Sequence, residues 1–465
     1  MKKFITVIIS ICTSGLCFSF DFEANGLYYN ILTNNEVEVV RDGNNFYQQT
    51  TITIPKTVKN NGITYNVTHI AHSAFWKCPN LTSITIAESI TTITDQAIND
   101  CPNLTTIVFN AKNCTHNTNT YLFCNLPKLS TLTIGNKVQS LPAGFIAYGN
   151  FQNLKTITIP NSVKTIGAQA FQGCSHLTSI TLGTGLTKIE NATFYGCSNL
   201  QSITIPNSVI SLEENAFGNC TGLTSITIPL NVTTLGGTAF AGCTNLKILY
   251  WNAKDCSITY SLYNNANQSI EKVVFGNQVE KVPAMFLMGD TKLNEVVIPN
   301  SITEISRMAF MDCSSITRLE LPDSNLKIKA FAFNNCSKIE SVELPVNLAQ
   351  IDTLAFGSCD GLKSVTYNTT NPIEIGYWQY GVYYNPFAPN WGYSLSNVEL
   401  IVPENAIETF LSMDGWKEFK LPDLQMGIED TIGSSDINGH KIFSNGQLFI
   451  YRGDKTYTIT GVKVK

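Results

Sequence analysis

The sequence predicts a solenoid in which short coils stack along one axis and their strands form one parallel β-sheet. Three observations predict this fold. Similar segments begin at Leu177, Leu200, Leu223 and Leu246, so the period is 23 residues. Each segment opens with alternating polar and apolar residues, which is the pattern of a strand with one buried face. One copy is too short to bury its own apolar row, so its neighbours must supply the other walls.

The copy that begins at Leu200 shows how one coil forms. Ile203 and Ile205 face inward, and Pro206, which has no amide hydrogen, turns the chain out of the strand. The apolar residues that follow lead into a return that ends at Cys220. Units of 20–29 residues with leucine-type spacing are typical of leucine-rich repeats. We therefore expect a leucine-rich-repeat solenoid with irregular or short helical returns.

The N-terminus, residues 1–19, has the pattern of an export signal. Lys2 and Lys3 precede an apolar run over residues 4–16, and small residues follow around a plausible cleavage point. Cys17 raises the alternative of a lipid-modified cysteine, but Leu16 stands where a small residue is needed. No other run reaches the roughly 18 apolar residues of a transmembrane helix.

The next two segments are a cap and the repeat array. Residues 20–66 contain β-forming runs separated by Asn and Gly turns, which predicts a small β cap over the open end of the stack. Residues 67–370 hold the array of about 13 coils. The predicted coil starts are Leu81, Leu104, Leu129, Leu154, Leu177, Leu200, Leu223, Leu246, Ile270, Leu293, Ile316, Ile339 and Leu362.

The repeated pattern LTSITIP-x-x-V-x-x-L-x-x-x-AF-x-x-C resembles the BspA-type class of bacterial leucine-rich repeats. The segment from Phe22 to Tyr29 and the Asn-Ala-Lys-Asn/Asp-Cys coils are also similar to members from the Bacteroidetes. The resemblance covers roughly residues 20–420. It implies a secreted or cell-surface protein, associated with the outer membrane, whose usual role is binding or adhesion. It implies no catalytic residues.

Residues 371–425 are expected to form a mixed α/β cap with an aromatic loop and a short helix that follows Pro403. Two interpretations of the aromatic loop stay open. Its rings either cover the end of the solenoid or form a platform that binds a glycan or a protein. The residues concerned are Tyr377, Trp378, Tyr380, Tyr383, Tyr384 and Trp391.

Residues 426–465 are predicted to be a linker followed by a terminal β module. The module resembles the C-terminal sorting signals of exported Bacteroidetes proteins, and a plain hairpin is an equal alternative. The tripeptide Arg452-Gly453-Asp454 matches the integrin-binding motif, but Gly-Asp is also ordinary turn chemistry, and we favour the turn.

The composition limits the partners. Charged residues make up 14% of the chain, below the roughly 25% of ordinary soluble domains. The net charge is −5 without a basic run, which argues against nucleic acid. Ten cysteines recur at one position of the repeat, where a small apolar group fits a core, so we expect a column of buried thiols rather than disulfides or metal ligands. No catalytic motif, cofactor motif or metal-ligand spacing is present.

The outward strand positions suggest where a partner binds. They are Ser and Thr in the earlier coils and become a mixture of aromatic, apolar and charged residues after Leu246. Such a mixture suits a protein interface. Drift alone is the alternative explanation. The candidate partner-binding residues are Tyr250, Lys272, Glu295, Arg318, Glu320 and Glu343.

These observations favour an exported, non-catalytic protein that binds an extracellular or surface protein through the strand face. The first alternative is a glycan-binding module that uses the aromatic loop. The second is an enzyme accessory module or hydrolase, which would need a pair of carboxylates in a cleft.

Overall fold

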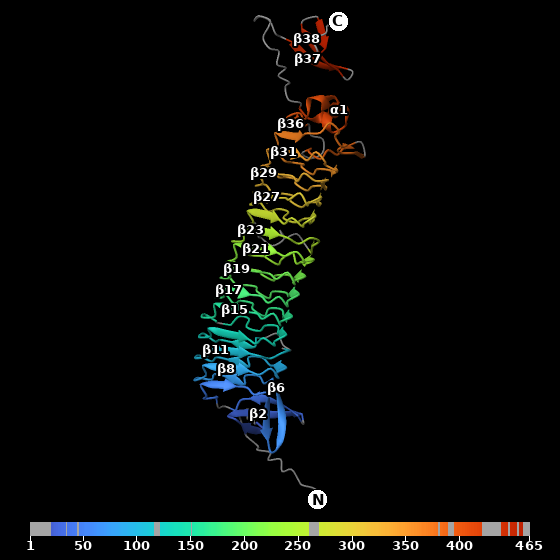
Figure 1. Ribbon diagram of the computed structural model, residues 1–465. Coiled ribbons are helices and arrows are strands. Elements are labelled where there is room, and N and C mark those ends of the chain that lie inside the picture. The colour runs from blue at the N-terminus through green and yellow to red at the C-terminus, as the bar shows by residue number, and fades with distance from the viewer. Residues whose placement is uncertain are drawn as a thin grey trace. The chain divides into compact units, whose positions relative to one another are not determined.

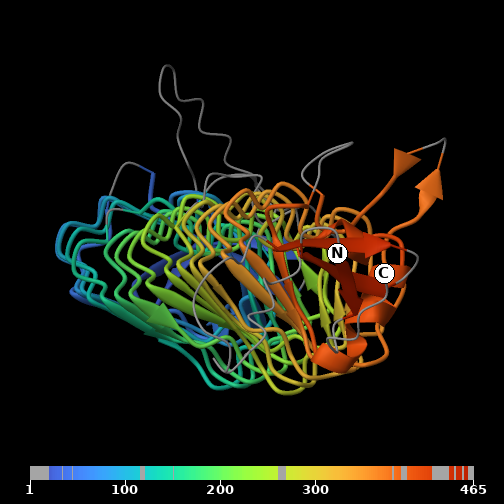
Figure 2. The same cartoon turned by 90° about the horizontal axis from the view of Figure 1, so that it is seen from above.

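The computed structural model describes residues 20–33, 35–43, 46–115, 121–149, 151–259, 269–379, 382–388, 395–420, 439–444, 447–452 and 455–458. The chain divides into two compact units, Met1–Leu293 (unit 1) and Asn294–Lys465 (unit 2), which are described separately. Within each unit short coils follow one another, and their parallel strands are stacked in chain order (Figure 1). Seen from above in Figure 2, the coils of each unit lie over one another. The predicted solenoid is confirmed.

Every predicted coil start is followed, two residues later, by the first residue of a strand. In unit 1 this row comprises β8 Ser83–Ile86, β11 Thr106–Phe109, β13 Thr131–Ile134, β15 Thr156–Thr158, β17 Ser179–Thr181, β19 Ser202–Ile203, β21 Ser225–Ile228, β23 Ile248–Trp251 and β25 Lys272–Phe275. In unit 2 it comprises β27 Glu295–Val297, β29 Arg318–Leu319, β31 Ser341–Leu344 and β33 Ser364–Tyr367.

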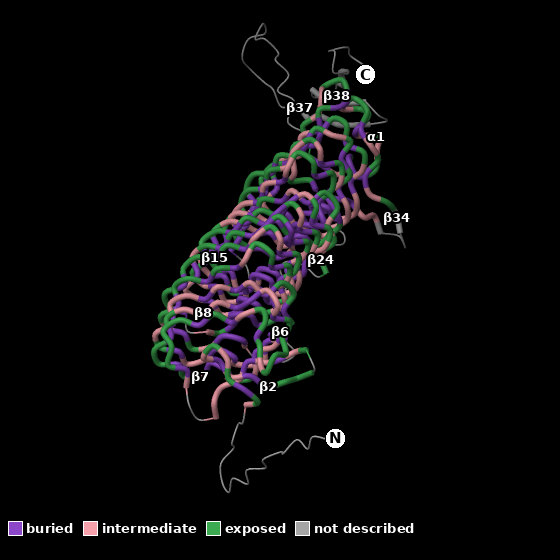
Figure 3. The backbone as a smooth tube through the Cα atoms, turned by 60° about the horizontal axis from the view of Figure 1, so that its bottom comes forward, coloured by how far each residue is buried: buried purple, intermediate pink, exposed green. Residues whose placement is uncertain are grey.

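The parallel register repeats the sequence period. Ile157 of β15 lies beside Ile180 of β17, which in turn lies beside Ile203 of β19. Inward residues therefore pack on their equivalents one coil away, while the residues between them face outward. Figure 3, in which the chain is coloured by the burial of each residue, shows buried and exposed residues following one another along each coil.

The returns differ from the irregular or short helical form that the sequence predicts. They carry a second row of parallel strands, each only two residues long, in which a polar residue precedes an Ile, Leu or Val. That apolar residue is buried in every case except Ile258, which is partly exposed. Coils spaced like neighbouring strands bring these pairs within hydrogen-bonding distance, so a strand forms where the sequence pattern is too short to reveal one. The row is β9 Thr92–Ile93, β14 Ser140–Leu141, β16 Thr165–Ile166, β18 Lys188–Ile189, β20 Ser211–Leu212, β22 Thr234–Leu235, β24 Ser257–Ile258 and β26 Lys281–Val282 in unit 1, and β28 Glu304–Ile305, β30 Lys327–Ile328 and β32 Gln350–Ile351 in unit 2.

The N-terminal strands join antiparallel hairpins to the parallel array. β1 (Phe22–Ala24), β2 (Leu27–Thr33) and β3 (Glu36–Val40) pair antiparallel, as do β5 (Thr57–Asn60) and β6 (Ile63–Ile70). β3 and β6 pair in parallel, and β6 pairs with β9 of the second row. The array already begins before β6, because β4 pairs in parallel with β8, and a third short row accompanies the first coils. β4 is Thr51–Thr53, and the third row consists of β7 Phe75–Trp76, β10 Ile98–Asn99 and β12 Phe123–Cys124.

The last coils of unit 2 end in a short segment of strand and helix. β36 (Glu399–Ile401) pairs in parallel with β33, and the helices η1 (Glu404–Ala406), α1 (Ile407–Ser412) and η2 (Trp416–Glu418) follow. A small hairpin of β34 (Trp378–Gln379) and β35 (Val382–Tyr383) projects from these coils in Figures 2 and 3. The terminal strands β37 (Gly439–Ser444), β38 (Gln447–Arg452) and β39 (Lys455–Thr458) form an antiparallel meander.

Stacked phenylalanine rings run through both units. In two series of consecutive coils, the repeated Phe lies nearly parallel to that of the next coil, with centroids 5.1–5.7 Å apart. The rings of these series belong to Phe171, Phe194, Phe217 and Phe240 in unit 1, and to Phe310, Phe333 and Phe356 in unit 2. They are buried, so each ring removes a large apolar area from water against the neighbouring coils.

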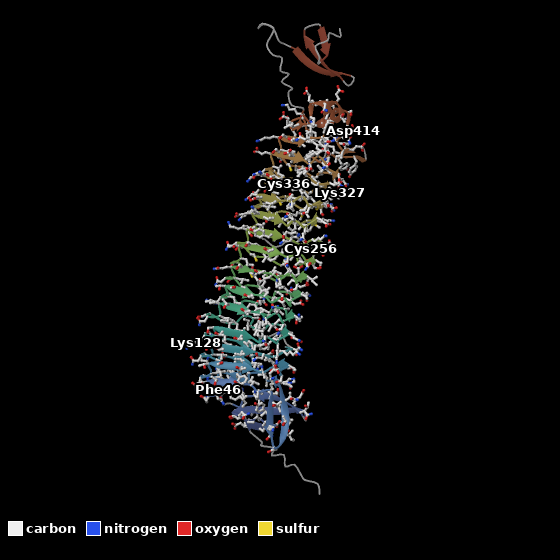
Figure 4. The ribbon with its side chains drawn as sticks, in the orientation of Figure 1. Phe46, Lys128, Cys256, Lys327, Cys336 and Asp414 are labelled. Atoms are coloured by element: carbon white, nitrogen blue, oxygen red, sulfur yellow. The ribbon has the colours of Figure 1, made fainter. Side chains whose placement is uncertain are left out.

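The ten repeated cysteines are free thiols, and all of them are buried except Cys124, which is partly exposed. Seven of them donate a hydrogen bond to a carbonyl of the preceding coil, usually that of its Phe, over 3.0–3.3 Å. These are Cys101, Cys174, Cys197, Cys220, Cys243, Cys336 (labelled in Figure 4) and Cys359. The thiol is thus a donor as well as a small apolar group.

The residue before several of the repeated thiols has a left-handed backbone, for example Gly196 at φ 73° and Asn219 at φ 56°. Gly and Asn adopt this conformation most readily, which explains their recurrence just before Cys in the sequence.

Several predictions from the sequence lie outside the described residues. They are the export signal at residues 1–19, the linker that begins at 426, and the turn at Gly453-Asp454. Within the described ranges, no helix is both long and apolar enough to span a bilayer.

Candidate functional site

Four of the predicted partner-binding residues lie together on the strand face of unit 2. Glu295 at the start of β27 is the direct neighbour of Arg318 at the start of β29. Arg318 forms an ion pair with Glu320, and both side chains are largely exposed. Glu343 occupies the position of Glu320 in the next coil, on β31. The alternation of buried and exposed residues along each strand fixes these four side chains outward.

These residues line two shallow hollows. The first has a volume of about 240 Å³ and is lined by Glu295, Val296, Val297, Ile298, Arg318 and Glu320. The second has a volume of about 440 Å³ and is lined by Leu319, Glu320, Leu321, Asp323, Glu343, Leu344, Pro345, Val346 and Asn368. Glu320 borders both, so the two hollows adjoin.

The hollows combine apolar and acidic surface. Val297 is 40% exposed and Val346 is 52% exposed, which is high for β-branched apolar side chains. Four acidic side chains line the two hollows against one basic side chain, that of Arg318; the acidic residues are Glu295, Glu320, Asp323 and Glu343. Apolar patches within a polar rim are typical of protein-binding surfaces.

The other two predicted residues lie on the strand face of unit 1. Tyr250 of β23 is 40% exposed and neighbours Val274 of β25, while Lys272 neighbours Ile248. Tyr250 and Lys272 therefore occupy adjacent strands within one unit. The outward positions of β15 and β17, by contrast, are the small hydroxyl residues Thr156, Thr158, Ser179 and Thr181.

The aromatic loop is divided between cap and surface. Phe387 is buried and stacks on Phe356 of the last repeated coil, with centroids 5.4 Å apart. Tyr377, in contrast, is 49% exposed and stacks on Tyr384 at 5.1 Å. The Tyr383 hydroxyl donates a hydrogen bond to the Ile375 carbonyl, and burial raises the pKa of Tyr383 to about 12.

For three of the predicted aromatic residues, the structure describes no side chain that would cover the end of the solenoid or form an exposed platform. Trp378 lies in β34, but its side chain is not described, and Tyr380 and Trp391 fall outside the described residues. Among the predicted aromatics whose side chains are described, the stacked pair Tyr377 and Tyr384 forms the exposed surface.

Glu214 has a role that the sequence does not suggest. The paired acids Glu213 and Glu214 look like solvated corner residues in the sequence. In the structure Glu214 accepts hydrogen bonds from the Thr238 amide at 2.8 Å and the Thr259 hydroxyl at 2.6 Å, both from the following coils. Burial raises the pKa of Glu214, but these hydrogen bonds outweigh burial and hold it below its usual range. Glu214 is therefore a link between coils.

In the described part of the chain, no three His, Cys, Asp or Glu residues are grouped so that they could hold a metal ion.

The comparison with known families finds repeated matches along the array. The sequence pattern of the BspA type leucine rich repeat region, in six copies, matches residues 44–148, 144–268 and 256–380. The comparison with curated proteins gave no match.

Solved structures similar to this chain include bacterial leucine-rich-repeat proteins. One from Bacteroides ovatus is 27% identical, with 75% of this chain and 94% of that chain covered and a TM-score of 0.49. A leucine rich cell surface protein from Faecalibacterium prausnitzii is 21% identical, with 74% and 94% covered and a TM-score of 0.38. The pneumococcal vaccine antigen PcpA is 19% identical, with 86% and 97% covered and a TM-score of 0.30.

Proposed function

This chain belongs to the BspA-type leucine-rich-repeat family, and we propose that it is an exported, non-catalytic protein that binds a protein partner through the strand face of unit 2. The observation that carries the proposal is the pair of adjoining hollows that share Glu320. A repeat array of this kind offers a wide surface, and a partner can engage several coils at once. Proteins of this family are generally non-catalytic, which favours binding over the hydrolase alternative.

The charge of this surface favours a partner that carries lysine or arginine. Glu295, Glu320, Asp323 and Glu343 line the hollows, and Arg318 is the basic residue of the same lining. Complementary charge speeds association and selects against acidic partners, while the exposed Val297 and Val346 would supply apolar contact. Binding should therefore weaken as the salt concentration rises.

Export and surface location are part of the same proposal. The pattern of residues 1–19 supports export. An adhesion role, in which the partner is a host or bacterial surface protein, agrees with a binding face built from the later coils.

The experiment measures binding of the mature chain, which starts near Phe20, to an array of extracellular proteins and glycans. The double variant Glu320→Lys/Glu343→Lys reverses the charge of the hollows, and we expect at least about a tenfold loss of affinity for protein hits, or about 1.4 kcal/mol. The matched control is Ser202→Lys/Thr204→Lys, which places two lysines on the unit 1 strand face. Equal affinity of the two double variants and the parent would refute the assignment.

Tyr377 and Tyr384 support a second candidate function, glycan binding. Their stacked, part-exposed rings could hold the apolar face of a sugar. Glycan hits on the same array that are lost in Tyr377→Ala but kept in Glu320→Lys/Glu343→Lys would favour this alternative.

A further inference from the structure

A third hollow lies at the N-terminal end of unit 1, where the hairpin strands meet the first coils. Its volume is about 510 Å³, within the roughly 300–1,000 Å³ of small-molecule sites. The residues that line it are Asn30, Glu38, Val40, Arg41, Ala71, His72, Ser73, Trp76 and Gln96. It is larger than either hollow on the strand face of unit 2 and shares no residue with them.

Paired strands hold the wall of this pocket in place. Asn30 of β2 is the antiparallel neighbour of Glu38 of β3, and its amide donates to the Glu38 carboxylate over 3.3 Å. Trp76 of β7 is the parallel neighbour of Asn99 of β10, and Gln96 lies just before β10. A wall built from hydrogen-bonded strands needs little reordering when a ligand binds.

Trp76 is the large apolar residue of the pocket, and its ring is fixed on several sides. Its Nε1 atom donates to Asp100 over 3.2 Å. The Phe46 ring, labelled in Figure 4, meets it edge-on with centroids 5.7 Å apart. The Arg41 guanidinium carbon lies 5.2 Å from the ring centre and the Lys77 ammonium 4.4 Å from it. A half-buried tryptophan held in this way forms a rigid part of the pocket wall beside Val40 and Ala71.

The polar residues of the wall offer every kind of hydrogen-bonding group. Glu38 can only accept, Arg41 can only donate, and the amide of Asn30 can do both. Gln96 accepts a bond from the Asn99 amide through its oxygen over 3.2 Å, so its NH₂ group is the donor that it can offer to the pocket. The charges of Glu38 and Arg41 balance, which favours a ligand without net charge.

We propose that this pocket binds a single neutral sugar residue of a glycan. A sugar ring has an apolar face that packs on a surface such as Trp76, Val40 and Ala71, and its hydroxyls both donate and accept hydrogen bonds. The pocket supplies these two kinds of contact side by side, on a rigid support. The proposal is independent of the protein-binding face, because the two sites share no residue.

The test titrates the full mature chain with the methyl glycosides of glucose, galactose, mannose and N-acetylglucosamine, and with N-acetylneuraminic acid. Binding is followed by calorimetry and by tryptophan fluorescence. At least one neutral glycoside should bind saturably, with a Kd on the order of 1 mM or below, near −4 kcal/mol. Trp76→Ala should weaken that binding by at least about tenfold.

Two further variants keep the test decisive. Gln96→Asn shortens the donor but retains a residue suited to its left-handed backbone, where φ is 50°, and should weaken binding by about threefold or more. Ile210→Ala removes an exposed apolar residue elsewhere in unit 1 and should leave binding unchanged. The proposal is overturned if no neutral glycoside binds, if only the acidic sugar binds, or if folded Gln96→Asn binds as the parent does.

Discussion

The ring of Phe387 lies almost parallel to the ring of Phe356, with an interplanar angle of 5° and centroids 5.4 Å apart. Phe356 belongs to the last repeated coil, whereas Phe387 comes from the segment that follows the array. The Phe387 ring therefore takes the place that the phenylalanine of another coil would have. Its ring also contacts Phe419 edge-on at 5.4 Å, so the closing segment is packed onto the same ring.

Phe387→Ala should uncover the end of the ring stack in unit 2. Burying this ring removes a large apolar surface, and truncation of buried phenylalanine typically costs about 3–5 kcal/mol. Hydrogen exchange of the amides in β31 and β33 should accelerate, while amides of β15 and β17 in unit 1 keep their protection. Tyr377→Ala is the control, since its half-exposed ring should change stability by less than about 1 kcal/mol. Unchanged protection in β33 of the Phe387 variant would show that the ring does not close the stack.

The repeat period explains why the coils could be predicted in detail, whereas the ring stacking at the C-terminal end of the array could not. A leucine or isoleucine every 23–25 residues places each strand start, and the alternation of residues such as Ser202 and Ile203 gives its inward face. The two-residue strands of the second row are too short to be recognised from an alternation of polar and apolar residues. Phe387 lies 31 residues after Phe356 and thus outside the period, so only the fold reveals their stacking.

The candidate sites also contain some residues that the sequence could predict and others that it could not. Arg318, Glu320 and Glu343 could be predicted because an outward strand position is read directly from the period. The pocket around Trp76 draws residues from several strands and turns of the cap and first coils, where no period relates them. Hydrogen bonds such as that from Thr259 to Glu214 depend on coil stacking and leave no signal in the local sequence.

Asp290 should make unit 1 less stable as the pH rises from about 4 to 6. Asp290 occupies the repeat position of the cysteine, because it lies three residues before Leu293 just as Cys220 lies three residues before Leu223. Its side chain is buried, with 3% of the residue exposed. One carboxylate oxygen accepts from the Lys292 amide at 3.0 Å, and the other has no hydrogen-bond partner among the residues that the structure describes. Burial raises the pKa of Asp290 from 3.8 to about 6. The unfolded chain therefore loses its proton first. The penalty on the folded state grows between these two pH values and keeps its full size once the folded carboxyl has ionised.

Asp290→Cys restores the thiol of the repeat and removes this penalty. A pKa difference of about two units corresponds to about 3 kcal/mol, so the variant should gain about 1–3 kcal/mol at pH 7.5 and little at pH 4. Urea unfolding of parent and variant at both pH values measures the gain. A gain of equal size at pH 4 and pH 7.5 would mean that the carboxylate charge is not its cause.

Glu214 should have the opposite pH dependence. Its pKa lies below 4.5 in the folded protein, because the hydrogen bonds from Thr238 and Thr259 outweigh burial. The stability that it contributes is present above the unfolded pKa and is lost as the pH falls through the folded pKa. Glu214→Gln should therefore be less stable than the parent at pH 7, and the difference should shrink toward pH 3. Glu213→Gln is the matched control, because the exposed ion pair of Glu213 with Lys188 contributes at most about 1 kcal/mol.

Replacing Cys220 should separate the two roles of the repeated thiol, the small apolar group and the hydrogen-bond donor. Its sulfur donates to the Phe194 carbonyl over 3.1 Å, and burial raises the pKa of the thiol well above 9. Cys220→Ala removes the donor and leaves a small void, so we expect a loss of about 1–3 kcal/mol. Cys220→Ser keeps a hydrogen-bond donor of similar size. Because this donor can still bond to the Phe194 carbonyl, we expect the serine variant to be more stable than the alanine variant. Urea unfolding compares them, and a serine variant clearly less stable than the alanine variant would show that the column selects sulfur for its apolar character alone.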